Sequence, residues 1–167
     1  MDGHNGTSLW LDKAEAMGPD SDLAEAVGLA GRCPAAFRGS ADYGWFLGTC
    51  AGRCVEMCRR LSVLRSPEYR TVRRIRFAIE ELMEDWTILP PPIMMTMLGT
   101  RRPMDLLIFL EAWPRRLLGY RPFYIGVLMG LYAENAPGTD DWGRDEVSRM
   151  RAVVETQRKA SGDVRLF

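Results

Sequence analysis

The chain has 167 residues, of which 47% are hydrophobic and 26% charged, so it can bury a core and global disorder is excluded. Its 22 basic and 22 acidic residues cancel, and bulk charge therefore indicates neither a nucleic-acid-binding protein nor an acidic solubilising tail. We expect one domain, or one domain with an extra helix.

Arginine supplies twenty of the 22 basic residues, since only Lys13 and Lys159 are lysines. Two explanations are open. Arginine makes forked contacts to phosphate and carboxylate and stacks on flat rings, which would make the bias functional. Alternatively, the bias reflects a GC-rich or overlapping coding sequence, and ten methionines and five tryptophans fit such a context, for example a viral genome.

No stretch of the sequence predicts insertion into a membrane. The start, MDGHNGTSLW, lacks the basic residues and apolar core of a signal peptide. The longest uncharged runs, 86–100 and 122–133, fall short of the roughly 20 residues that cross a bilayer. We expect no transmembrane segment and an intracellular location, cytoplasmic or nuclear.

Residues 1–31 form an acidic N-terminal segment, with six acids against Lys13 alone. Short helices are predicted around 9–17 and 22–30. Asp22, with Glu25 three residues later, has the pattern of a capping box at the start of the second helix.

A helix is predicted over 41–64, because apolar residues recur there at steps of three and four, with Glu56 and Arg59 opposite them. Gly44, Gly48 and Gly52 each weaken this helix by roughly 1 kcal/mol relative to alanine but permit close approach of another backbone.

The next helix is predicted over 67–86, opened by Pro67 and ended by the prolines of LPPPIMM. We expect LPPPIMM to form an exposed apolar loop, followed by a short helical turn at 93–98.

Further helices are predicted from Pro103, over 122–134 and over 141–161, with a loose tail at 162–167. The 122–134 segment is apolar on nearly every side, which is typical of a central helix, and Gly126 and Gly130 would let a neighbour pack closely. No alternating pattern predicts a sheet. The expected fold is all-α, a compact bundle of about six to eight helices around 122–134, with 41–134 as its core.

Little in the sequence indicates an enzyme. His4 is the single histidine, and no glycine-rich phosphate loop or other cofactor motif is present. We predict no catalytic residue, no cofactor and no metal site.

Four cysteines, Cys33, Cys50, Cys54 and Cys58, could in number hold zinc, but three of them are spaced by four along one helix, whereas structural zinc favours knuckles in turns. We interpret them as buried thiols in a reducing compartment, and metal binding, palmitoylation and redox chemistry stay open. The acids Glu80, Glu81, Glu84 and Asp85 are interpreted as a solvated face.

The neutral total hides charge segregation. Ten arginines lie between Arg32 and Arg76, against three acids, and residues 101–121 are also basic. In the 67–86 helix arginines precede the acids, the order that the helix dipole disfavours by about 0.3–1 kcal/mol. The arginines either pair internally with the acidic N-terminal segment or face outward toward a partner.

The second explanation predicts a binding surface, because Phe77 lies among the arginines and can stack a base or anchor a partner. The residues that we predict to make the contacts are Arg70, Arg73, Arg74 and Phe77, with Arg59, Arg60 and Arg65 as a second group.

The sequence thus favours a non-enzymatic helical interaction protein, in the setting of a viral accessory, matrix or nucleocapsid-associated protein. Its acidic partner would be a nucleic acid, RNA included, or an anionic membrane surface. A protein partner is the other class. We also expect a homo-oligomer, because methionine- and tryptophan-rich helices leave apolar surface to bury.

The alternative is a helix-groove adaptor that binds host regulatory proteins. Trp142-Gly143-Arg144 is similar to the Trp-Gly-Arg signature of Bcl-2-like proteins. In that family the signature precedes the central hydrophobic helix, whereas here it follows the apolar 122–134 segment. The resemblance covers three residues and implies binding of an amphipathic peptide with weak salt dependence.

Overall fold

The structure is a computed structural model that describes residues 2–18, 21–61, 67–87, 89–100 and 121–135, with residues 105, 148–149, 151–152 and 155. Within these residues it contains six α-helices and no strand, which confirms the predicted all-α class. The helices are α1 (Asp2–Met17), α2 (Leu23–Gly31), α3 (Ala41–Leu61), α4 (Pro67–Leu82), α5 (Pro91–Thr100) and α7 (Arg121–Asn135).

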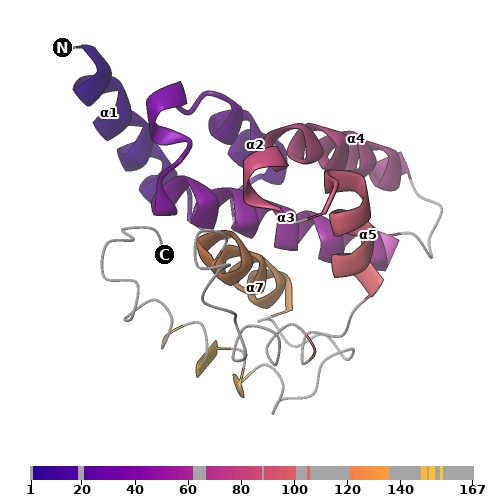
Figure 1. Cartoon of the computed structure of the whole chain (residues 1–167). Helices are drawn as coiled ribbons and strands as arrows, with labels where there is room; N and C mark the ends of the chain where they lie inside the picture. The colour runs from indigo at the N-terminus through magenta and orange to yellow at the C-terminus, as the bar shows by residue number, and fades with distance from the viewer. Residues whose placement is uncertain are drawn as a thin grey trace.

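The longest helix, α3, forms the centre of the bundle (Figure 1). It contacts α7 most extensively and also packs on α2, α4 and α5. Every residue from Asp42 to Glu56 is buried. The predicted buried segment 122–134 corresponds to α7, whose Phe123, Ile125 and Leu128 are fully buried.

Glycines let α3 and α7 pack with their backbones in contact. A β-carbon on Gly48 or Gly52 would overlap the backbone of α7, and one on Gly126 or Gly130 would overlap the backbone of α3. The two pairs, each spaced by four, therefore face each other across one interface. This confirms the prediction that these glycines permit close approach.

Local sequence signals fix the helix starts. The Asp22 carboxylate accepts a hydrogen bond from the backbone N–H of Glu25 at 3.0 Å, as a capping box requires at the start of α2. Pro67 is the first residue of α4 and Pro91 of α5, where the missing proline N–H costs nothing.

Helix ends differ from the prediction. α4 ends at Leu82, and a 3₁₀ turn, η2 (Glu84–Trp86), follows it. The Trp86 ring covers Gly44, where a β-carbon would lie 2.7 Å from the ring. The turn therefore places the Trp86 ring against α3.

The LPPPIMM segment is a loop only at its first two residues, because α5 begins at Pro91, and the predicted short turn at 93–98 is part of this ten-residue helix. Met94, Met95 and Leu98 are buried because one face of α5 packs on α3 and α4. Leu89 and Ile93 remain exposed, at 38% and 54%.

Two acids predicted to face solvent are buried instead. Glu56 is 2% exposed and pairs with Arg59, and Glu80 is 9% exposed and pairs with Arg76. The prediction that the side of α3 opposite its apolar residues faces solvent is wrong, because α7 packs against that side.

The helix predicted from Pro103, the C-terminal helix over 141–161, the tail and the Trp142–Arg144 signature lie outside the described residues, apart from the few positions given above. None of the described helices is long and apolar enough to span a membrane.

Candidate partner-binding surface

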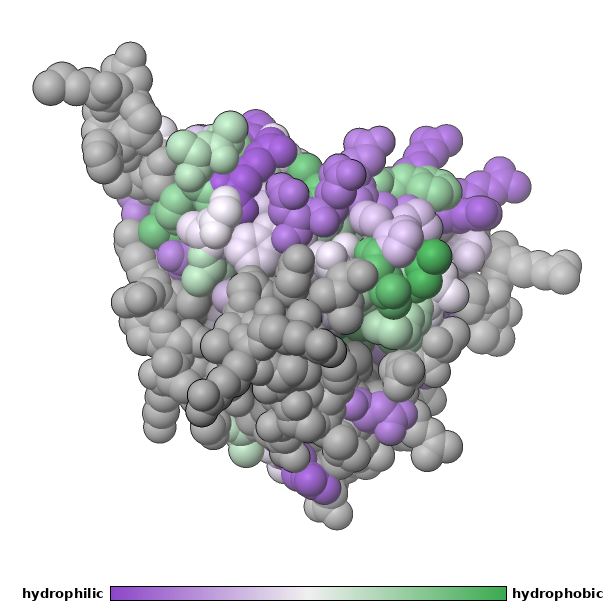
Figure 2. All heavy atoms as spheres, in the orientation of Figure 1, coloured by the Kyte–Doolittle hydropathy of each residue, from purple (hydrophilic) through white to green (hydrophobic). Residues whose placement is uncertain are grey.

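The outer face of α4 carries Arg70, Arg73, Arg74 and Phe77, all exposed to solvent. Their spacing of three, four and seven residues places them on one side of the helix. The opposite side buries Val72 and Ile79 against the bundle and so fixes which side turns outward. Figure 2 shows hydrophilic residues gathered over α4 along the upper edge of this view. We call these four residues the arginine surface.

Phe77 is held at the surface by its neighbour one turn back. The guanidinium carbon of Arg73 lies 5.9 Å from the centroid of the Phe77 ring, a cation–π distance. The ring is nevertheless 54% exposed, which leaves it open to a partner.

The three arginines of the surface have no acidic partner in the described part of the chain. No described carboxylate lies within 4.0 Å of Arg70, Arg73 or Arg74, whereas Arg53, Arg59, Arg60 and Arg76 all form ion pairs. The alternative explanation is that these arginines pair with the acidic N-terminal segment. The described residues contain no such ion pair.

Two of the three residues of the second predicted group form ion pairs within the molecule. Arg59 pairs with the buried Glu56, and Arg60 donates to Glu134 at 2.6 Å. Arg65 lies outside the described residues. A contribution of Arg59 and Arg60 to partner binding stays a prediction, but both already neutralise a carboxylate inside the molecule.

The order of charges along α4 has a structural explanation. Because the helix ends at Leu82, Glu84 and Asp85 belong to η2 and not to the last turn of α4. Arg76 donates to Glu80 at 2.9 Å and to the Thr96 hydroxyl at 3.1 Å, which ties α4 to α5. The acidic half of α4 thus contains a carboxylate, Glu80, that pairs within the molecule, whereas the arginines of the basic half are exposed.

Sequence reasoning missed a network around Glu134. Its carboxylate accepts from Arg53 at 3.0 Å and from Arg60 at 2.6 Å, and Arg53 also donates to the Ser21 carbonyl at 2.7 Å. Glu134 is 81 residues from Arg53 in the chain, and no local pattern signals such a pair.

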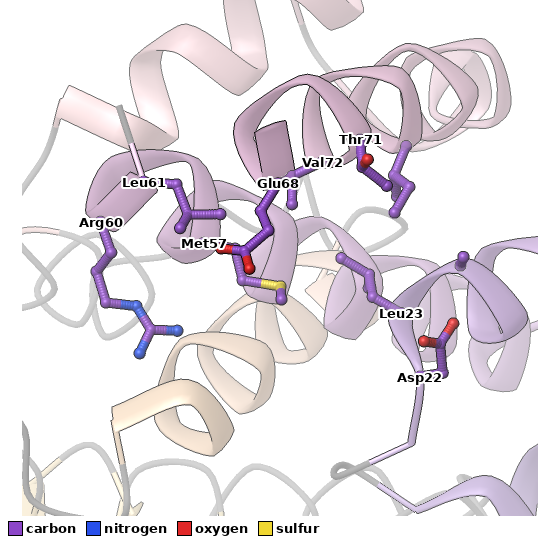
Figure 3. Close-up of a pocket in the computed structure, with 10 residues that line it drawn as sticks. Asp22, Leu23, Met57, Arg60, Leu61, Glu68, Thr71 and Val72 are labelled. Atoms are coloured by element: carbon purple, nitrogen blue, oxygen red, sulfur yellow. The ribbon is translucent and has the colours of Figure 1, made fainter. Parts of the chain in front are cut away.

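A groove of about 550 Å³ lies between α2, α3 and α4. Figure 3 shows Leu23, Met57 and Leu61 around it, with Arg60 and Asp22 at opposite ends. Its volume falls in the range of small-ligand sites, and its lining is mainly apolar with an acidic side chain, Glu68, beside it.

Three of the four cysteines are buried, and Cys58 is half-buried. Burial raises the pKa of Cys50 to about 12 and the pKa of Cys33 to about 11, so both are neutral thiols at neutral pH. Among the described residues no three histidine, cysteine or acidic side chains cluster in a way that could hold a metal ion.

Comparison of the chain with protein families, with curated proteins and with solved structures found no match.

Proposed function

We propose that the chain is a non-enzymatic helical interaction protein whose arginine surface binds single-stranded nucleic acid. The observation that carries this proposal is the cluster of three arginines, without an acidic partner in the described residues, around an exposed aromatic ring. A single strand offers both groups that such a cluster recognises, phosphates for the guanidinium groups and an unstacked base for the ring.

An anionic membrane is the competing partner, since Ile93 on α5 is also exposed. A helix that lies in a membrane interface buries a broad apolar face. The outer face of α4 instead has Phe77 among arginines, and Glu81, one turn further along the helix, is also exposed. This pattern favours a base that stacks on one ring over a membrane that buries a whole apolar face.

The proposed setting is a viral accessory, matrix or nucleocapsid-associated protein that acts as a homo-oligomer. The composition supports this setting through its arginine bias and its many methionines and tryptophans. An oligomer would also multiply a small binding surface and so raise its affinity for a long strand.

The test is fluorescence anisotropy of a labelled single-stranded RNA across a salt series, with anionic vesicles measured in parallel. Three phosphate contacts predict a slope of log K against log salt near −2. Arg70→Glu/Arg73→Glu/Arg74→Glu should abolish RNA binding. A matched control, Arg32→Glu/Arg149→Glu/Arg151→Glu, makes the same charge change at other exposed arginines and should retain most of the affinity. Binding of vesicles but not RNA, or equal losses in both variants, would contradict the proposal.

A second candidate function uses the groove between α2, α3 and α4. Its apolar lining and the acids Asp22 and Glu68 suit an amphipathic helix with a basic residue beside its apolar face. Binding of such a peptide would depend weakly on salt and would be lost in Leu61→Glu. The triple substitution on α4 would leave it unchanged, which separates the two functions.

A further inference from the structure

Cys54 and Cys58 lie one turn apart on α3, and their environments differ. Cys54 is fully buried, and its Sγ lies 3.8 Å from the carbonyl oxygen of Val72. Cys58 is half-buried. The Cys54 thiol can also donate a hydrogen bond to the sulfur of Cys58. Its single proton can bond either the carbonyl or that sulfur.

Cys58 lines a pocket of about 250 Å³ between α3, α4 and α5. Arg59, Tyr69, Arg76 and Thr96 supply polar groups to its wall. The pocket is separate from the groove between α2, α3 and α4, and it places the more accessible of the two sulfurs beside guanidinium groups.

The groups around Cys58 lower the pKa of its thiol. The hydrogen bond from Cys54 lowers the pKa of Cys58, burial opposes this, and the positive charges of Arg76 and Arg73 lower it further against the charge of Glu80. Arg59 and Arg76 are partly neutralised by Glu56 and Glu80. Arg73 has no carboxylate partner among the described residues, so its charge is the least compensated.

We propose that Cys58 is a modification site that exchanges with a small anionic disulfide, glutathione disulfide being the representative of this class. The Cys58 thiolate attacks one sulfur of glutathione disulfide, the disulfide bond breaks, and glutathione thiolate leaves and takes a proton from water. The product is a mixed disulfide whose carboxylates lie beside the guanidinium groups of the pocket. Glutathione disulfide is the oxidant, and no other reactant is needed.

The same geometry argues against two other outcomes. Side chains four apart on a helix have β-carbons about 5–6 Å apart, whereas a disulfide needs about 3.5–4.5 Å. A Cys54–Cys58 disulfide would therefore require α3 to distort. Direct modification of Cys54 is blocked by its complete burial.

The experiment incubates the reduced full-length chain with glutathione disulfide and measures intact mass and the modified peptide over time. We expect one adduct, on Cys58, while Cys33, Cys50 and Cys54 stay unmodified. Cys58→Ser should remove it. Adduct distributed over several cysteines, or none on the folded chain, would overturn the proposal.

A pair of arginine variants tests the role of charge without disturbing the core. Arg73→Gln should slow the exchange at Cys58 about threefold or more, because it removes the least compensated charge near the sulfur. Arg74→Gln is the matched control, because it makes the same charge change at an exposed arginine of the same helix. Equal rates in the two variants would overturn the proposal. Both variants weaken the proposed RNA surface, but the exchange with glutathione disulfide is measured without RNA, so each proposal can fail while the other holds.

Discussion

At the scale of single residues, Gly126 is one of four glycines in the contact between α3 and α7 where a side chain has no room. A methyl group there would meet the carbonyl of Trp45 and the backbone N–H of Thr49, and neither can move unless α3 and α7 separate. We expect Gly126→Ala to lower the free energy of unfolding by about 3 kcal/mol, at the upper end of overpacking costs. Urea denaturation followed by circular dichroism measures this.

Gly31→Ala is the control for that substitution. Gly31 ends α2 with nothing within 4 Å of its β-carbon position, so alanine should be neutral or slightly stabilising. If Gly126→Ala unfolds at the same urea concentration as the wild type, the backbone contact between α3 and α7 is not as close as described.

At the scale of elements, Glu134 joins α7 to α3 through Arg53 and Arg60. Glu134→Gln should lower the free energy of unfolding by about 3 kcal/mol, because it leaves the Arg53 side chain, only 8% exposed, without its counter-charge. The exposed pair Arg151–Glu155 gives the comparison, since Glu155→Gln should change stability by about 0.5 kcal/mol or less. Similar losses in the two variants would mean that the buried pair does not hold these helices together.

The elements also show what sequence can and cannot predict. Helix starts at Leu23 and Pro67 follow from local signals, a capping aspartate and a first-turn proline. The exposed face of α4, with Phe77, follows from helical periodicity. The burial of Glu56 and Glu80 does not, because a helical projection gives the faces of one helix and not which neighbours cover them.

The candidate sites also differ in whether the sequence could predict them. The arginine surface lies within one helix, so its members could be predicted together from their spacing. The Glu134 network and the pocket at Cys58 each combine helices far apart in the chain. A sequence pattern confined to one helix contains no information about such contacts.

At the scale of the whole molecule, the net charge is zero, but the arginines fall into two groups. Those of α3, together with Arg76, neutralise acids within the fold. Arg70, Arg73 and Arg74 are exposed and have no acidic partner among the described residues. We therefore propose that this one helix face is the ligand-binding surface.

Amide chemical-shift mapping of the isotope-labelled full chain, titrated with a short single-stranded RNA, tests that claim most directly. We expect the perturbations to centre on residues 70–77 of α4 and to fade as salt is added. Perturbations centred on the groove residues Leu23, Met57 and Leu61, or spread evenly over all basic residues, would contradict it.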